Sequence, residues 1–192
     1  MHFRNILGHP VLSQSDIICL TETNITDDNA DRHQIQEKQL IHLGHCTVAN
    51  CHGLAIYATS KYRMRLHTKK FYPFMELLCA EILFQRTTHT IALVYRSPST
   101  PPKAFIDHLS QWTSTNLPYV ILGDMNIDPK TAAYKQLTRK LSGYRQIVNK
   151  ATHISGSTLD LIFIRHQEDI PDTYIFPTYF SDHSVIHFPL CY

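Results

Sequence analysis

Short apolar runs that end in an acidic residue are the feature that most restricts what this sequence can fold into. Val120–Leu122 is followed by Gly123 and Asp124, and Ile17–Leu20 is followed closely by Glu22. Continuous apolar runs of this length are typical of buried strands. A carboxylate beside a buried strand costs several kcal/mol unless it has a partner. We therefore expect these carboxylates to meet at one rim of a sheet.

Two more polar groups interrupt or precede strand-like runs in the same way. Asp160 lies in the run Ser157–Arg165, and Asp182-His183 precedes the run Ser184–Leu190. Taken singly, such residues are more often turn or capping residues. Their repetition at strand ends favours one shared site, where carboxylate oxygens suit Mg²⁺ or Mn²⁺. A neighbouring His–Asp pair could move the proton of an attacking water, so the pattern indicates phosphodiester hydrolysis.

The rest of the pattern predicts more strands than helices. We expect strands over Gly53–Thr59, Lys61–Lys70, Met75–Phe84 and Thr90–Tyr95, and helices over Lys103–Thr115 and Thr131–Leu141. The 61–70 strand alternates and places its basic side chains on one face, namely Lys61, Arg63, Arg65, His67 and Lys69. That face could contact DNA phosphates, or it could be a solvated edge strand. With no linker or repeat, the pattern predicts one α+β or α/β domain.

Composition and charge exclude several other classes of protein. The 192 residues are 43% hydrophobic, which is enough for a core, and the net charge of +2 does not by itself indicate a nucleic-acid binder. The apolar runs fall far short of the roughly 18 residues that span a bilayer. With no signal-peptide core at the N-terminus, we expect an intracellular protein without membrane contact.

The five cysteines are an odd number without the spacing of a disulfide framework. We interpret them as reduced thiols. His45-Cys46 and Cys51-His52 could in principle offer zinc ligands, but their spacing departs from that of common structural zinc sites. We therefore do not predict a structural zinc ion.

Five segments together resemble the endonuclease/exonuclease/phosphatase superfamily. They are Cys19–Thr23, Val94–Pro98, Leu122–Asn126, Ser157–Ile162 and Ser181–His183. The resemblance covers nearly the whole chain and is strongest to apurinic-type endonuclease domains of mobile elements, either LINE-type non-LTR retrotransposons or Helitron-associated. It implies a four-layer α/β (α+β) sandwich, in which two mixed β-sheets pack face to face between flanking helices.

The resemblance also implies roles for residues of the metal and phosphate sites. Glu22 matches the metal-binding glutamate, and Asp182 matches an acidic residue near the metal. Tyr95 matches a tyrosine that contacts the scissile phosphate, and Asn126 matches the asparagine that holds that phosphate. The implied cofactor is Mg²⁺ or Mn²⁺.

The proton-transfer and DNA-flanking residues follow from the same resemblance. Asp124 matches an aspartate assigned to proton transfer, and Asp160 would pair with His183 and fix its tautomer. Either Asp124 or His183 could be the general base. Thr152 and Ser181 resemble polar residues that flank the DNA groove.

The implied function is a metal-dependent endonuclease that nicks target DNA and leaves a 3′-hydroxyl. It would act as a monomer in the nucleus, beside reverse transcriptase or helicase modules of the same element. One departure concerns the first strand of the family, which carries an asparagine and lies well upstream of the glutamate. Only 21 residues precede Glu22, and Met1–Ser15 resembles the helix after that strand. We therefore expect a single domain over residues 1–192 that lacks this strand.

Two alternatives stay open at this point. The chain could be an inactive, truncated DNA-binding remnant, because the missing strand would leave a sheet edge unpaired. It could also be a phosphomonoesterase or lipid phosphodiesterase of the same superfamily, since the net charge is low.

Overall fold

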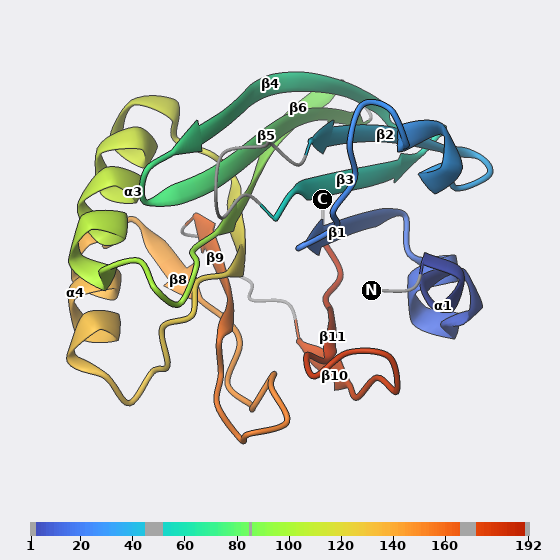
Figure 1. Ribbon diagram of the computed structural model, residues 1–192. Coiled ribbons are helices and arrows are strands. Elements are labelled where there is room, and N and C mark those ends of the chain that lie inside the picture. Colours follow the sequence, from blue (N-terminus) through green and yellow to red (C-terminus); the bar gives the residue numbers. More distant parts are fainter. Residues whose placement is uncertain (1–2, 45–51, 85, 166–171, 191–192) are drawn as a thin grey trace.

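Two β-sheets pack face to face in the computed structural model, and helices cover their outer faces (Figure 1). The structure describes residues 3–44, 52–84, 86–165 and 172–190. This arrangement confirms the expected α/β sandwich. No helix within these ranges is long and apolar enough to cross a bilayer.

The larger sheet has six strands in the order β4-β5-β6-β7-β9-β8. Its strands are β4 (Arg63–Tyr72), β5 (Met75–Phe84), β6 (Thr87–Tyr95), β7 (Val120–Asp124), β8 (Tyr144–Gln146) and β9 (Asp160–Arg165). The sheet is mixed, because β6 and β7 are parallel while the other neighbours are antiparallel. Helix α3 (Pro102–Asn116) makes the crossover between β6 and β7. As a result, β6 and β7 end at the edge where β9 begins.

The smaller sheet is antiparallel in the described part of the chain, with the order β1-β3-β2. Its strands are β1 (Ile17–Thr21), β2 (Lys38–Leu43) and β3 (Leu54–Thr59). A separate antiparallel pair is formed by β10 (Tyr174–Phe176) and β11 (Val185–His187). The sequence did not predict β2, β8 or β10. The expected final strand over residues 184–190 is shortened to β11.

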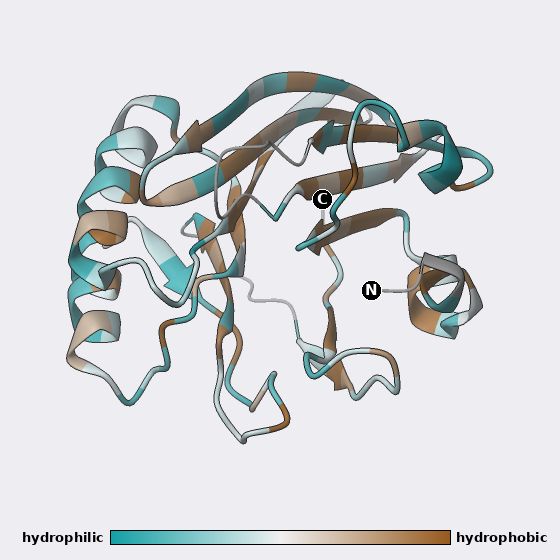
Figure 2. Cartoon of the chain, in the orientation of Figure 1, coloured by the Kyte–Doolittle hydropathy of each residue, from teal (hydrophilic) through white to brown (hydrophobic). Residues whose placement is uncertain are grey.

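Three apolar layers hold the sandwich together. On the first, α1 (Phe3–Gly8) and α2 (Pro10–Gln14) pack against the outer face of the three-stranded sheet. Between the sheets, Leu54 and Ile56 of β3 meet Leu78 and Leu93. Figure 2 shows brown along much of the strands and teal along much of the helices on the left. Burying each such side chain contributes about 1.5–3 kcal/mol.

The third layer joins the six-stranded sheet to α3 and α4 (Ala132–Lys140). Phe105, Ile106 and Leu109 of α3 are fully buried there, as their spacing predicts. The hydroxyl of Thr131 caps α4 by accepting a hydrogen bond from the Tyr134 amide at 3.2 Å. Both helices lie within one residue of their predicted bounds. A short 3₁₀ helix, η1 (Ala30–His33), precedes β2.

The predicted alternation of the 61–70 strand is wrong in its second half. Lys61 lies in the turn before β4, and a bulge shifts the register between Leu66 and Thr68. The extra residue of a bulge reverses the faces beyond it. Thr68 pairs with Cys79, so it lies on the face opposite to that of Leu66, which pairs with Ala80. Leu66, the last residue before the bulge, was expected to point inward and is 41% exposed.

A cavity of about 630 Å³ runs beside the smaller sheet. All five residues of β1 line it on one side, and residues 180–190 line it on another. Among the described residues, β1 pairs only with β3 and β11 pairs only with β10. The cavity therefore lies along strand edges with unpaired backbone groups.

Candidate active site

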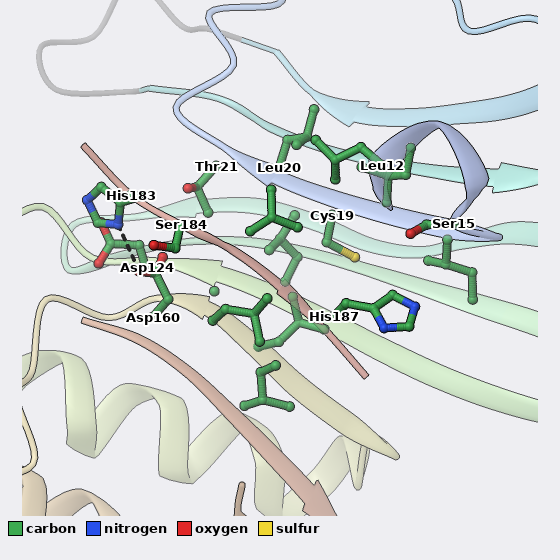
Figure 3. A pocket seen from close by; sticks show the side chains of 18 of the residues that line it. Leu12, Ser15, Cys19, Leu20, Thr21, Asp124, Asp160, His183, Ser184 and His187 are labelled. Atoms are coloured by element: carbon green, nitrogen blue, oxygen red, sulfur yellow. Dashed lines mark hydrogen bonds and ion pairs between the residues drawn. The ribbon is translucent and has the colours of Figure 1, made fainter. Parts of the chain in front are cut away.

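Asp124, Asp160 and His183 lie together at one end of this cavity (Figure 3), which Glu22 and Asp182 also line. Tyr95 is the last residue of β6, and Asp124 is the last residue of β7. Asp160 begins β9 and pairs directly with Asp124 in the ladder. Glu22 follows β1 in the other sheet, and His183 precedes β11. The site thus lies where the ends of both sheets meet.

The backbone at this rim is strained at the residues that matter. Gly123 has a φ of +136°, and a Cβ there would lie 1.9 Å from the Val94 carbonyl oxygen. Only glycine therefore lets β7 approach β6 just before Asp124. Glu22 and Asn126 have φ values of 53° and 49°. Left-handed backbone costs a non-glycine residue about 1–2 kcal/mol, and such residues cluster at functional sites.

Asp160 and His183 form a hydrogen-bonded pair, with Nδ1 of the ring 2.8 Å from Oδ2 of the carboxylate. This bond raises the pKa of His183 to about 9, against the opposing effect of burial. His183 is therefore cationic at neutral pH, with Nε2 left for other partners. The Ser181 hydroxyl accepts a hydrogen bond from the His183 amide at 3.1 Å and so fixes its backbone.

Asp124 is 5% exposed and is held by its neighbour in the chain. The amide N–H and side-chain amide of Asn126 donate to its two oxygens at 3.0 and 3.1 Å. Burial raises the pKa of Asp124 to about 7, and the like charge of Asp160 adds to the effect. The bond from Asn126 and the charge of His183 oppose this rise. Asp124 can therefore exchange a proton near neutral pH.

Tyr95 is buried, and its hydroxyl donates to Oε1 of Glu22 at 2.5 Å. Burial, reinforced by this bond, raises the pKa of Tyr95 well above its usual value. The phenol therefore remains a protonated donor. His52 Nδ1 lies 3.7 Å from the same Glu22 oxygen, so Glu22 is oriented from two sides.

A protein-family model described as the endonuclease/exonuclease/phosphatase family matches residues 3–183. The chain belongs to this family. Its members are metal-dependent hydrolases. No curated protein sequence is significantly similar to the chain.

Several solved structures share the fold. The endonuclease domain of TRAS1, a telomere-specific non-LTR retrotransposon, is 14% identical with a TM-score of 0.69, covering 96% of this chain and 89% of that one. D. rerio TDP2 complexed with a single-strand DNA product is 12% identical with a TM-score of 0.70, covering 97% and 90%. The human nocturnin catalytic domain is 16% identical with a TM-score of 0.61, covering 97% and 86%. At these identities the likeness establishes the fold alone.

The donors at this family site fit a hard divalent cation. Ligand atoms of Asp124, Asp160 and His183 lie within 4.8 Å of one another. Glu22 and Asp182 line the same cavity. Carboxylate oxygens in this number are suited to Mg²⁺ or Mn²⁺. Of the residues that the sequence analysis considered as ligands of a structural zinc ion, His45, Cys46 and Cys51 lie outside the described residues.

Thr152 lies inside the protein and not at its surface. Its hydroxyl accepts hydrogen bonds from the amides of Leu159 and Asp160 at 3.0 and 3.2 Å. Thr152 therefore sets the position at which Asp160 enters β9.

Two of the predicted DNA-contacting cations already have acidic partners. Lys61 Nζ lies 2.6 Å from Asp16, and Arg65 lies 2.5 Å from Glu81. Both pairs are at the surface, where such pairs contribute about 0–1 kcal/mol. They remain accessible, but part of their charge is neutralised.

The remaining two cations lie at different distances from the site. Phe71 of β4 pairs with Glu76 of β5, and Glu76 pairs with Tyr95 of β6. The end of β4 that contains Phe71 therefore lies nearest to the site. Lys69 is two residues from Phe71, whereas Arg63 is eight residues away. At roughly 3.3 Å per residue, Arg63 lies about 25 Å along the strand. Lys69 is thus brought near the site and Arg63 is not.

Arg96 is a buried positioning residue that the motif contained but the sequence did not distinguish. Its guanidinium donates to the carbonyls of Met125 and Asn126 at 2.7 and 2.6 Å. Its own carbonyl accepts from the Asn126 side chain at 2.7 Å. Arg96 thereby holds the strained turn after Asp124. A cation directly after an apolar strand was the available signal.

Glu76 supports the other side of the site and was also missed. It is 5% exposed and accepts hydrogen bonds from the amides of His52 and Gly53 at 2.8 and 2.9 Å. The Gly53 carbonyl in turn accepts from the Thr23 amide at 3.2 Å. Glu76 thus fixes the turn that carries Glu22. Its signal was a charged residue inside the apolar Met75–Phe84 run.

Proposed function

We propose that this protein is a divalent-metal-dependent phosphodiesterase that nicks DNA and leaves a 3′-hydroxyl. The observation that carries the proposal is the convergence of Asp124, Asp160 and His183 within 4.8 Å. Their proton affinities differ, with pKa values of about 7 for Asp124 and about 9 for His183. Titratable pairs with separated pKa values are suited to acid and base roles.

The chain's own residues would divide the reaction as follows. Asp124 accepts the proton of the attacking water as its oxygen bonds to phosphorus. The P–O3′ bond breaks, and protonated His183 gives its proton to the departing 3′-oxygen. Asn126 and the Tyr95 hydroxyl would orient the phosphate by exchanging their bonds to Asp124 and Glu22 for bonds to its oxygens. Asp160 keeps His183 in place, which preserves the direction of proton transfer.

Glu22 and Asp182 would hold the divalent cation. When bound, Mg²⁺ or Mn²⁺ supplies positive charge that stabilises the negative phosphate oxygens in the transition state. Their carboxylates come from different parts of the chain, after β1 and before β11. Metal affinity therefore depends on both of these segments being in place.

The proposed substrate is the target DNA of a mobile element. The likeness to a retrotransposon endonuclease domain and to a DNA-bound TDP2 supports this choice. In that role the protein would act as a monomer in the nucleus, with polymerase or helicase modules of the same element using the 3′-hydroxyl. Lys69 and Ser181 lie where they could contact DNA flanking the scissile phosphate.

We also propose that a strand outside the described residues completes the domain. It would pair with the free edge of β1 and fill the apolar cavity beside it. Without such a strand, the runner-up function is a DNA-binding remnant without activity. Restoration of nicking by a longer chain that includes the strand would favour the proposal over the remnant.

A comparison of hydrolysis rates on three substrates tests the function. Purified protein with Mg²⁺ is assayed on supercoiled plasmid, bis(p-nitrophenyl) phosphate and p-nitrophenyl phosphate, with His183→Ala as the inactive control. We expect activity on the plasmid and the diester that the variant loses. Activity on the monoester alone would select a phosphomonoesterase and contradict the proposal.

A further inference from the structure

A second group of potential metal ligands lies on the outer side of His183. It consists of His153, Asp182 and His183, whose ligand atoms lie within 4.8 Å of one another. His153 lies in the loop that follows Thr152. In the site described above, Thr152 serves only to support Asp160. His153 has no role in the proposed hydrolysis.

The main chain sets this group in place. His153 and His183 form an antiparallel bridge, and the Ile154 amide donates to the Asp182 carbonyl at 2.9 Å. The Ser184 amide donates to the Thr152 carbonyl at 2.7 Å. Because backbone bonds join the two segments, the side chains do not need to be gathered by a ligand.

The distances suit a small tetrahedral ion. Nε2 of His153 lies 3.4 Å from Oδ2 of Asp182. Ligands about 2.0–2.1 Å from a tetrahedral zinc ion are roughly 3.3–3.4 Å apart. A simple histidine–carboxylate hydrogen bond would explain this pair. It does not explain the third donor, His183, whose ring centroid is 4.9 Å from that of His153.

Both rings also have the outer partners that metal-binding histidines usually have. Nδ1 of His183 bonds to Asp160 at 2.8 Å, and Nδ1 of His153 lies 2.7 Å from the Ser155 hydroxyl. The Ser155 amide also donates to Nδ1 of His153 at 3.1 Å, which puts the ring proton on Nε2 beside Asp182. For Nε2 to bind an ion, this proton moves to Nδ1, where the Ser155 hydroxyl can accept it. A carboxylate behind a histidine fixes its tautomer and strengthens it as a ligand.

We propose that His153, Asp182 and His183 bind a zinc ion that inhibits the enzyme. Two imidazoles and one carboxylate favour Zn²⁺ over Mg²⁺, which prefers oxygen ligands. With Nε2 of His183 bound to zinc, this ring no longer donates a proton to the substrate. Binding of the ion is independent of the proposed function, whereas the inhibition rests on it.

Isothermal titration with Zn²⁺ tests the binding. The parent carries Cys46→Ser and Cys51→Ser, because thiolates elsewhere would also bind zinc. It is compared with His153→Gln and, as a matched control, with His67→Gln on the exposed face of β4. We expect the dissociation constant to rise at least about tenfold in His153→Gln. It should stay unchanged in His67→Gln.

An equal affinity in the parent and in His153→Gln overturns the proposal. Should His153→Gln fail to fold by circular dichroism, His153→Asn takes its place under the same criterion. Inhibition is then measured as the zinc concentration that halves each protein's own Mg²⁺-dependent rate. In His153→Gln this zinc concentration should rise by the same factor as the dissociation constant. A parent without hydrolytic activity refutes the proposed function, while the titration still decides on the zinc site.

Discussion

Replacing Asp124 by asparagine is expected to remove activity and to stabilise the fold at alkaline pH. The carboxyl group has an ordinary pKa of 3.8, which burial and the nearby Asp160 raise to about 7. The folded state thus binds this proton more tightly than the unfolded state does. The contribution of Asp124 to stability is fully present below pH 3.8 and is lost as the pH rises through about 7.

The magnitude follows from the two pKa values. A tenfold difference in proton affinity is about 1.4 kcal/mol, so the ionised carboxylate destabilises the fold by up to about 4 kcal/mol. Between pH 5 and pH 8, the loss amounts to about 2–3 kcal/mol. Asparagine does not titrate. One of the two bonds from Asn126 is lost, because the new amide nitrogen cannot accept it; this costs about 1–3 kcal/mol at every pH and leaves the slope unaffected.

Urea denaturation at pH 5, 6, 7 and 8 measures this effect. The free energy of unfolding of Asp124→Asn, minus that of wild type, should increase by about 2–3 kcal/mol across the range. Asp107→Asn is the control, because Asp107 is a surface residue of α3 whose pKa is lowered by Lys103 and therefore lies below the tested range. A difference that stays flat for Asp124→Asn would refute the assignment of a raised pKa.

Three further results are expected. The rate of hydrolysis should rise with pH through about 7, as Asp124 loses its proton, and fall through about 9, as His183 loses its own; a pH-independent rate from 6 to 10 would contradict these roles. Gly123→Ala should lower the free energy of unfolding by more than about 3 kcal/mol, because its Cβ would overlap the Val94 carbonyl oxygen of β6. Gly143→Ala is the control, since a Cβ at that position has nothing within 4 Å, and thermal melts should show little change in its stability. Glu76→Gln should raise the Mg²⁺ concentration for half-maximal rate severalfold, and Glu81→Gln should not; equal values for the two would rule out a positioning role for Glu76.

The features that sequence patterns predicted were those with a local cause. The buried strands ending at Asp124 and Glu22 could be predicted because an apolar run and its terminal charge are adjacent in the chain. Helices α3 and α4 could be predicted because proline, the Thr131 cap and the apolar spacing all lie within them. The family resemblance then supplied the order of the layers.

The features that could not be predicted depend on contacts between distant segments. β8 and β10 have three residues each and exist only through their partners. The bulge in β4 reverses the faces of its second half, and no local signal marks it. The support that Glu76 gives to Glu22 passes through a turn 23 residues away, so it becomes visible only in the fold.

Cleavage of a 5′-labelled DNA duplex most directly tests whether this site hydrolyses phosphodiesters by the proposed route. The reaction is run with Mg²⁺ and with EDTA, for wild type, Asp124→Asn and His183→Ala, and the products are offered to a DNA polymerase. The account predicts a metal-dependent nick whose labelled product ends in an extendable 3′-hydroxyl, and no nick from either variant. A nick that both variants make as fast as wild type, or one that the polymerase cannot extend, would contradict it.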